Sequence, residues 1–452
     1  ILERLFCFQL CDQNNMLDIK FIRDNPEGLK KSLKDRRVEF DVDYLLELDE
    51  KRRAKIKEVD DLRARQNELS DNIAKIGGSE REDKISESKK LKALLGDAEF
   101  EMKALEDEFL ELMYKIPNIP LDDVPVGKDA GENKVIRKWG EVPKFNFAPK
   151  DHLELGEALD IIDIERAAKV TGTRFGYFKR EAALLEFALI QFTFSLLTSE
   201  RELKRIADSV VKGYSAKPFI PVIPPVMVRP DAMTKMARLT EQDKDERYYL
   251  PKDDLYLVGS AEHTLGPMHM DEIFNEDDLP IRYLGFSTSF RRESGSYGQD
   301  TRGVLRVHQF DKIEMESFTL PENSIKEQHF IVVIQERLVQ ELKIPYRVVA
   351  ICTGDMGKPD ARQIDIECWM PGQDKYRETH TSDLMTDYQT RRLNTKLRRK
   401  NGKLEFVHTN DATAFAIGRI IIAILENYQE EDGSVKIPKV LQKYMGMRVI
   451  KR

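Results

Sequence analysis

Three absences narrow the class of protein to which this 452-residue chain belongs. It has no apolar run close to the roughly 20 residues that a membrane-spanning helix needs. Its four cysteines are too few for a disulfide framework, and Cys7 and Cys11 lack a second pair at the spacing of a structural zinc site. Because sparse cysteine is typical of a reducing compartment, we expect a cytoplasmic protein that makes no membrane contact.

The common glycine-rich phosphate loops are also missing. The chain contains neither a GxxxxGK[ST] segment nor a GxGxxG segment, so side chains would have to hold the phosphates of a bound nucleotide. The net charge of −7 argues against a nucleic-acid binder that works by bulk charge, although a local basic surface remains compatible with it. The charged fraction of 34% is high and is typical of long exposed helices.

Two stretches near the start have the spacing of such helices. Apolar residues recur every three or four positions from Leu45 to Ile76, with polar residues at some steps, until Gly77 and Gly78 interrupt the pattern. A second series stops at Pro117 and has a 4-3-4-3 spacing: Leu91, Leu95, Ala98, Met102, Leu105, Phe109, Leu112 and Ile116. We predict an antiparallel helical hairpin about 45 Å long. Both a dimerisation coiled coil and an arm that reaches a large partner fit this pattern.

The rest of the chain predicts a mixed domain. Residues 117–150 are rich in Pro and Gly and indicate a linker. Helices are expected at 154–169, 181–213, 323–342 and 411–430. Strands are expected near 219–223, 255–258, 281–290, 304–318, 345–351, 363–370 and 404–408. Because the strands come in adjacent runs, without strict alternation with helices, we predict an antiparallel sheet in an α+β domain.

The most informative segment is residues 290–314, FRRESGSYGQDTRGVLRVHQFDKIE. It is expected to form a strand, a glycine-containing loop and a returning strand, with Arg291 and Glu293 on one face. Alternation places Arg306, His308, Phe310, Lys312 and Glu314 on one face of the second strand, and Leu305, Val307, Ile313 and Met315 on the other. The polar face could hold a phosphate, a flat base and an ammonium group. The alternative without a binding site is an ordinary amphipathic hairpin whose charged face is solvated.

These residues resemble the seryl-tRNA synthetases, which are class II aminoacyl-tRNA synthetases. FRRESGSYGQDTRGVLRVHQFDKIEM is similar to the second motif of that family, and HTNDATAFAIGR to the third. PFIPVIPPVMVRPDAM resembles the first motif, whose proline, here Pro225, lies in the family's dimer interface. DIECWMPGQDKYRET and TDYQTRR resemble segments that precede the third motif. The resemblance runs from Met16 over nearly the whole chain.

The resemblance implies the class II antiparallel sheet with flanking helices, plus an N-terminal coiled-coil arm. Residues 1–15 are expected to be an extension that is non-native or disordered, because MLDIKFIRDNP from Met16 looks like a natural start. Residues 16–125 would then form a tRNA-binding helical arm domain, and 126–452 the catalytic domain. The family's arm grips the long variable arm of its tRNA, so the resemblance favours the reaching arm over the dimerisation coiled coil.

The implied reaction is activation of L-serine with ATP, followed by transfer of the seryl group to the 3′ end of tRNA(Ser) and also of tRNA(Sec). ATP and Mg²⁺ are the implied cofactors, and a homodimer the implied assembly. One alternative is an amino acid:carrier-protein ligase, although such relatives lack the arm. Another is an inactive binding protein, although Arg291, Glu314 and Arg419 are all retained. The SAE and DKIE carboxylates and the hairpin argue against a prolyl or threonyl enzyme.

The resemblance assigns the nucleotide site residue by residue. The implied ATP-binding set is Arg291, Arg292, Glu293, Val307, Phe310, Glu378, Thr379, His380, Thr381 and Arg419. Arg291 would face the α-phosphate and Arg419 the γ-phosphate, and these two are the expected catalytic residues. Glu378 would bind Mg²⁺, while Phe310 would stack on adenine near Glu293. His380 stands where the family usually has a small hydroxyl residue.

The implied serine-binding set is Ser260, Ala261, Glu262, Arg291, Glu314 and Thr413. A pocket that hydrogen-bonds the serine hydroxyl rejects alanine, because alanine would leave a buried polar group unpaired. Glu262 and Glu314 match the carboxylates that face the ammonium and hydroxyl groups. Ser260 stands where threonine is common, Asp411 replaces an expected asparagine, and Leu384 replaces a commonly polar residue. No general base is expected, because phosphate substitution by a carboxylate needs positioning and charge neutralisation.

Overall fold

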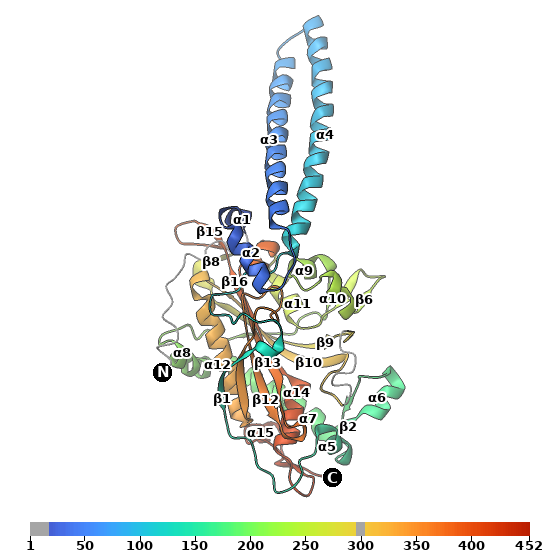
Figure 1. Ribbon diagram of the computed structural model, residues 1–452, viewed down its shortest axis with the longest axis vertical. Helices are drawn as coiled ribbons and strands as arrows, with labels where there is room; N and C mark the ends of the chain where they lie inside the picture. Colours follow the sequence, from blue (N-terminus) through green and yellow to red (C-terminus); the bar gives the residue numbers. More distant parts are fainter. Residues whose placement is uncertain (1–17, 295–302) are drawn as a thin grey trace. The chain divides into compact units, whose positions relative to one another are not determined.

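A computed structural model describes residues 18–294 and 303–452 of the chain (Figure 1). Its contacts divide the chain into two compact units, with the division between Ile119 and Pro120. The expected extension at 1–15 lies outside the described residues, as does part of the loop within 290–314. The two units are taken in turn.

The first unit is built on a long helical hairpin, as predicted. Its helices are α1 (Ile19–Asp24), α2 (Pro26–Asp35), α3 (Val42–Ile73) and α4 (Ser79–Lys115). The α3 and α4 helices run side by side (Figure 1), and the turn between them includes Gly78 at a φ of 68°, which suits glycine. The end of α4 at Lys115 comes just before the predicted stop.

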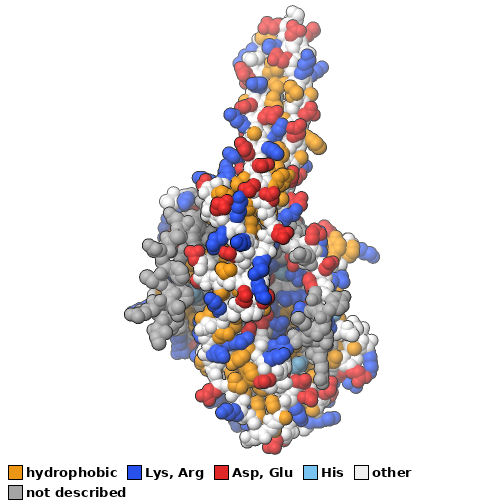
Figure 2. All heavy atoms as spheres, viewed as in Figure 1, with side chains coloured by type: hydrophobic (Ala, Val, Ile, Leu, Met, Phe, Trp, Pro, Cys, Tyr) orange, Lys and Arg blue, Asp and Glu red, His pale blue; other side chains and the backbone are white. Residues whose placement is uncertain are grey.

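Polar pairs across the hairpin explain the gaps in its apolar pattern. The Arg52 guanidinium lies 4.2 Å from the centroid of the Phe109 ring and 2.9 Å from the carboxylate of Glu106. Lys55 pairs with Glu101 at 2.7 Å in the same way. Long side chains of this kind cover apolar surface with their stems and keep the charge at the rim. Figure 2 shows basic and acidic side chains interleaved along the visible face of the hairpin.

The second unit is an α+β domain around an eight-stranded sheet, which confirms the predicted class. The strand order is β1 (Lys134–Trp139), β11 (Tyr346–Ala350), β12 (Arg362–Met370), β13 (Lys375–Thr386), β16 (His408–Ala416), β10 (Gln309–Thr319), β9 (Ile281–Phe290) and β4 (Ile220–Val222). Neighbouring strands are antiparallel except β4 and β9, which are parallel. Small sheets are formed by β15 (Leu404–Phe406), β14 (Lys396–Arg398) and β8 (Ile273–Asn275); by β5 (Met227–Val228), β7 (Leu255–Leu257) and β6 (Tyr249–Leu250); by β2 (Ile162–Asp163) and β3 (Tyr177–Phe178); and by β17 (Val435–Lys436) and β18 (Val449–Ile450).

Helices bury one face of the large sheet. The helices of this unit are α5 (His152–Ala158), α6 (Ile164–Thr171), α7 (Arg180–Leu197), α8 (Glu200–Val210), α9 (Pro230–Lys235), α10 (Glu241–Glu246), α11 (Glu262–Leu265), α12 (Ser324–Leu342), α13 (Tyr388–Leu393), α14 (Ile417–Asn427) and α15 (Gln442–Met445). Side chains of α7, α12 and α14 share the main apolar core with Ile313 and Met315 of β10 and Phe415 of β16. The opposite face of β10 carries Lys312 and Glu314, as the alternation predicted.

Several predicted elements near the third motif are wrong. Residues 411–416, expected to be helical, belong to strand β16, and only α14 after them is a helix. The side chains of β16 are buried almost throughout, so its sequence lacks the alternation of a half-exposed strand. Strand β13 was not predicted. In the segment 290–314, the second strand begins at Gln309 and not at 304, so residues 304–308 form turns.

Two predicted helices are each broken in two. The stretch 154–169 contains α5 and α6 with strand β2 between them, because Asp160 turns the chain at a φ of 55°. The stretch 181–213 contains α7 and α8, which meet at a bend of 70°. Among the described residues, no one helix has the length and apolar character to cross a membrane, and α7 with α8 passes such a test only as a bent pair, by length and composition.

Candidate active site

A pocket of about 190 Å³ opens on the face of the sheet that the core helices leave free. Its walls come from the end of β9, the turns after residue 303, strands β10, β13 and β16, and the start of α14. The lining residues are Arg238, Glu262, Arg291, Glu293, Val304, Leu305, Arg306, Val307, Phe310, Lys312, Glu314, Glu378, Thr379, Thr381, Asp383, Asp411, Thr413, Ala416, Gly418 and Arg419. Most residues assigned from the sequence therefore meet in one place.

Arg291 and Phe310 form one wall. Arg291 follows the last residue of β9, and its Nε donates to the carbonyl of Gly259 at 3.2 Å. Its guanidinium lies 5.3 Å from the centroid of the Phe310 ring. The ring therefore belongs to the pocket and not to the core. A cation beside a half-buried ring leaves room for a phosphate and a flat base close to each other.

The turns before β10 change the predicted roles of their residues. Leu305 and Val307 were expected to face the core from a strand. Leu305 does belong to the main apolar core and Val307 packs against it, but both also line the pocket because the chain has not yet entered β10. This places Val307 where the resemblance assigned it. The segment is held from outside, since the backbone N–H of Val304 donates to Nε2 of His152 at 3.3 Å.

Glu293 lines the pocket, whereas Arg292 does not. Glu293 has a φ of 54°, and its carboxylate is ion-paired with Arg306. Arg292 instead donates to the backbone carbonyl of Arg247 at 2.8 Å and lies over the ring of Tyr248. The ATP-binding assignment of the Arg292 side chain is thus not supported by where it lies.

The opposite wall is formed by β13 and α14. Arg419 donates to the backbone carbonyl of Glu378 at 2.9 Å, and its guanidinium lies 3.2 Å from the Glu378 carboxylate. Both side chains remain partly exposed, with 31% and 49% of their side-chain surface open. Thr379 and Thr381 line the same wall. Arg291 and Arg419 therefore both line the pocket, from different walls, and arginine is well suited to binding phosphate oxygens.

His380 does not line this wall, because alternation along β13 places it on the face opposite Thr379 and Thr381. A β-bulge just before it brings Glu378 to the pocket together with Thr379. Ile366 pairs with His380 and Glu367 pairs with Glu378, so one extra residue is inserted between them. The His380 ring is fully buried against Phe415, with a centroid distance of 5.5 Å. Burial lowers its pKa to about 3, so the ring is neutral near pH 7. The assignment of the His380 side chain to ATP binding does not fit this position.

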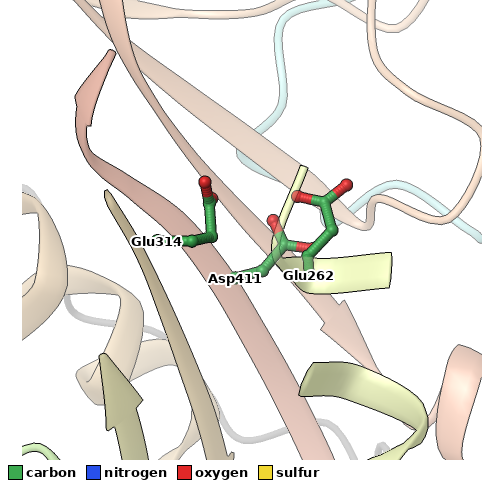
Figure 3. A group of neighbouring side chains, drawn as sticks. All are labelled: Glu262, Glu314 and Asp411. Carbon is green, nitrogen blue, oxygen red and sulfur yellow. The ribbon is translucent and has the colours of Figure 1, made fainter. Parts of the chain in front are cut away.

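Three carboxylates converge at the deep end of the pocket. Glu262, Glu314 and Asp411 each offer one oxygen, and these oxygens lie within 4.8 Å of one another (Figure 3). Ser260 is buried behind them, with its hydroxyl 3.3 Å from a carboxylate oxygen of both glutamates. Lys312 Nζ lies 2.6 Å from Glu314, so this carboxylate already has one cation beside it.

The surrounding charges set different proton affinities in this cluster. Burial tends to raise the pKa of Glu262, but Arg238 and Lys312 outweigh it and hold that pKa below its usual range. Burial raises the pKa of Glu314 to about 6, opposed by Lys312 and helped by Glu262. Burial and neighbouring carboxyl groups raise the pKa of Asp411, and the Arg238 guanidinium, 3.0 Å from its carboxylate, opposes that rise. Glu262 is therefore the most firmly ionised member of the group.

The structure also places residues that sequence reasoning assigned to the amino-acid site. Thr413 lines the pocket, and its hydroxyl lies 3.4 Å from Lys312 Nζ. Ala261 is fully buried at the N-terminus of α11 and lies behind the lining. Leu384 is fully buried in an apolar cluster away from the pocket, which explains why an apolar residue is tolerated there.

Sequence reasoning missed Arg238 and Asp383. Arg238 pairs with Glu262 at 3.0 Å, with Asp411 at 3.0 Å and with Asp383 at 3.7 Å. Asp383 shares the pocket face of β13 with Thr381, so alternation would have found it had β13 been predicted. Arg238 follows a short helix in a segment without a motif, and nothing in its neighbourhood signalled a buried cation.

Comparisons with known proteins agree with this geometry. The model of the class II tRNA synthetase core domain (G, H, P, S and T) matches residues 244–428, and that of the seryl-tRNA synthetase N-terminal domain matches 16–120. The serine–tRNA ligase of Dictyoglomus turgidum is 44% identical over 96% of this chain and 99% of its own length. That of Rubrobacter xylanophilus is 42% identical over 96% and 99%.

Solved structures of seryl-tRNA synthetases are also similar to this chain. The seryl-tRNA synthetase of Pyrococcus horikoshii, complexed with ATP, has a TM-score of 0.84 and 40% identity, covering 96% of this chain and 99% of its own. The cytoplasmic serine–tRNA ligase of Naegleria fowleri, in complex with AMP, has a TM-score of 0.82 and 30% identity, covering 97% and 99%. With both units matched and nearly full length covered, the chain belongs to the seryl-tRNA synthetase family.

Proposed function

We propose that this protein is a serine–tRNA ligase that activates L-serine with ATP and transfers the seryl group to the 3′ end of tRNA(Ser). The observation that carries the proposal is the pocket itself. Arginines on two walls, an aromatic ring and a buried carboxylate cluster all face one space. Family membership supports the same activity.

ATP would lie between the two walls. Arg291 would hold the α-phosphate and Arg419 the γ-phosphate, while adenine stacks on Phe310 close to Glu293 and Val307. A guanidinium can bond two phosphate oxygens at once, so Arg291 would stabilise the charge that develops when the serine carboxylate attacks the α-phosphorus. The bond from that phosphorus to the β-phosphate oxygen would break, so pyrophosphate would leave and seryl-adenylate would remain. The reaction needs alignment of two anions and not a base, and the pocket offers cations for this purpose.

Mg²⁺ fits the donors on the phosphate wall. Glu378 is partly exposed, and the Thr381 hydroxyl lies 3.5 Å from its carboxylate. Magnesium takes oxygen ligands and is usually bound by one or two carboxylates together with substrate phosphates. Glu378 would therefore hold the ion, and Thr379 and Thr381 would contact the nucleotide beside it. The ion would neutralise phosphate charge during attack.

Serine would occupy the deep end. Its ammonium group would meet Glu262 and Glu314, whose oxygens converge there with that of Asp411. Its hydroxyl would bond Glu314 or Thr413, so that alanine would leave one of these buried groups unpaired. Ser260 would act from behind by fixing both glutamates, since its hydroxyl lies between them.

The helical hairpin would bind the tRNA, and two copies of the chain would form a dimer. The match of residues 16–120 to the seryl-tRNA synthetase N-terminal domain supports the first point. The second is supported by β4, which is an edge strand with Ile220 and Ile223 exposed beside it. We include tRNA(Sec) as a further substrate because its long variable arm would offer the hairpin a similar surface.

The test of the activity is ATP–pyrophosphate exchange with serine, alanine, threonine and glycine offered separately. We expect exchange with serine and at least about a thousandfold less with alanine, because a site built for a hydroxyl rejects the analogue that lacks it. Charging of a tRNA(Ser) transcript would then test the second step. An absence of exchange with serine would overturn the proposal and favour an inactive binding protein.

A further inference from the structure

A row of carboxyl groups crosses the sheet beneath the amino-acid end of the pocket. Glu316 of β10 pairs in register with Asp411 of β16, and Asp411 pairs in register with Asp383 of β13. All of these side chains are buried. Like charges directly opposite each other destabilise a sheet, so such a row needs bound protons or a cation.

Arg238 supplies that cation. Its guanidinium is 15% exposed and lies 3.0 Å from Asp411, 3.7 Å from Asp383 and 3.0 Å from Glu262. It therefore joins the row to the carboxylate that is expected to receive the serine ammonium. Arg238 acts on Glu316 only through its charge, because among the described residues neither carboxylate oxygen of Glu316 has a hydrogen-bond partner.

The backbone holds Arg238 in this position. It follows α9, where Ala237 reverses the chain at a φ of 57° and the Arg238 N–H donates to the carbonyl of Met233 at 3.0 Å. The side chain of Gln389, from α13, donates to the carbonyl of Met236 at 3.2 Å. Bonds from two elements thus fix the point from which the guanidinium enters the cluster.

We propose that Arg238 is a positioning residue of the amino-acid pocket and that it works as a charge-compensated pair with Asp411. Within the pair, Asp411 compensates the charge of Arg238, so the negative charge of Glu262 stays available to an ammonium group. This inference rests on the proposed function, since it assigns serine to that end of the pocket. Arg238 acts through Glu262 and not by touching the reacting atoms.

Removing either charge alone should weaken serine binding. In Arg238→Gln, the carboxyl groups lose their guanidinium, so they repel one another and take up protons. In Asp411→Asn, the guanidinium is left to Glu262 and the more distant Asp383, and it offsets more of the charge that should attract the ammonium. In the double variant, both charges of the pair are removed together, so neither is left uncompensated. The two introduced amide groups can still hydrogen-bond to each other.

The experiment measures KM and kcat for serine, and KM for ATP, by ATP–pyrophosphate exchange in the full-length chain. We expect each single variant to raise the KM for serine about tenfold or more, and the double variant to return to within about threefold of wild type, because contacting residues are not additive. The KM for ATP should stay within about twofold throughout. Arg229→Gln, at an exposed arginine of the same segment, is the matched control and should change none of these values.

The outcomes separate the two proposals. No serine-dependent exchange by the wild-type chain would overturn the proposed function and this inference with it. Exchange by the wild type with an unchanged serine KM in both single variants would overturn the inference alone. A double variant that is at least as impaired as the worse single variant would also overturn it, because the damage would then be structural. Thermal unfolding of each variant shows whether it folds. If Arg238→Gln fails to fold, the inference is tested by whether the double variant has a lower serine KM than Asp411→Asn.

Discussion

At the scale of single residues, the pocket separates its charges by position. Arg291 and Arg419 carry positive charge at the nucleotide walls, while Glu262, Glu314 and Asp411 gather at the deep end. The separation orients a ligand that is anionic at one end and cationic at the other. An amino acid placed between them would present its carboxylate to the phosphate end and its ammonium group to the acids.

Glu314 makes serine binding depend on pH. Its pKa is raised to about 6 by burial, so the carboxyl group is protonated below that pH and ionised above it. An ammonium ligand favours the ionised form, and its binding should therefore weaken as the pH falls through 6. We expect the KM for serine to rise about tenfold for each pH unit below this point, because one proton must leave for each serine bound.

The measurement is exchange kinetics at saturating ATP from pH 5 to 8, with the KM for ATP followed as the control. A serine KM that is flat over this range would contradict the prediction. Glu314→Gln should give a higher serine KM at pH 8 that no longer rises in the same way below pH 6.

Arg291 should be needed for chemistry more than for binding. Arg291→Lys keeps the charge but loses the fork that bonds two phosphate oxygens, so kcat should fall by about a hundredfold. The KM for serine should change little in comparison. Arg292→Lys is the matched control, since that neighbour points away from the pocket, and a similar loss in both variants would contradict the assignment.

His380 should matter for stability and not for nucleotide binding. Its ring is buried against Phe415 and bonded to the Thr379 hydroxyl at 2.8 Å. His380→Asn should destabilise the fold by about 1–3 kcal/mol through lost packing, with the KM for ATP unchanged. Thermal unfolding and exchange kinetics on the same preparation would check both points, and a large change in ATP KM at an unchanged melting temperature would argue against this interpretation.

At the scale of elements, local patterns predicted the helical hairpin and failed at the third motif. The hairpin has long apolar periodicity with a glycine break, which a sequence displays directly. Strand β16 does not, because side chains on both of its faces are buried and its apolar residues run straight into α14. Strand β13 was not predicted, so the alternation that places His380 opposite Thr379 and Thr381 was not applied to it. The bulge at Glu378 is a one-residue insertion seen only against its partner strand β12, so no pattern within β13 could reveal that Glu378 lines the pocket as well.

The site residues show the same difference between positions that a local sequence pattern indicates and positions that it does not. Most of the motif residues assigned to the site line the pocket, because the motif fixes both the residue type and its phase. Arg238 was missed because its role depends on contact with Asp411, which lies 173 positions away in the sequence. Leu305 and Val307 contact the core as predicted, but the pattern did not show that they also line the pocket through turns that precede β10.

The hairpin should act on tRNA and not on adenylate formation. Cross-helix pairs such as Gln66 with Ser88 and Lys55 with Glu101 define its register. Replacing residues 64–91 with a short glycine loop removes the distal ends of α3 and α4 with the turn between them and keeps the pairing of Lys55 with Glu101. We expect exchange with serine to stay within about twofold of wild type, since distant sites act independently.

Aminoacylation of tRNA(Ser) by this shortened chain should be strongly reduced. Its residual activity should match that of the wild-type chain on a tRNA(Ser) transcript whose variable arm has been deleted. Equal charging of the full tRNA by both proteins would contradict a role for the hairpin.

At the scale of the whole molecule, the edge of the large sheet is where a second copy should dock. Strand β4 is the last in the sheet order, and Ile220 and Ile223 beside it are 49% and 86% exposed. Ile223→Asp should convert a dimer to a monomer, because a buried unpaired carboxylate at an interface is costly. Light scattering after size exclusion would measure the mass, with Val170→Asp, at an exposed apolar residue of α6, as the control. A wild-type monomer would contradict the dimer directly.

The pairing of Arg238 with Asp411 also has an evolutionary consequence. If a chain that carries one of these charges without the other is impaired, then neither can be gained or lost alone without passing through a weakened ancestor. The two charges should be inherited together, although they lie 173 positions apart and on different elements. Among relatives of this chain, we expect the basic residue and the acidic residue to appear and disappear as a unit.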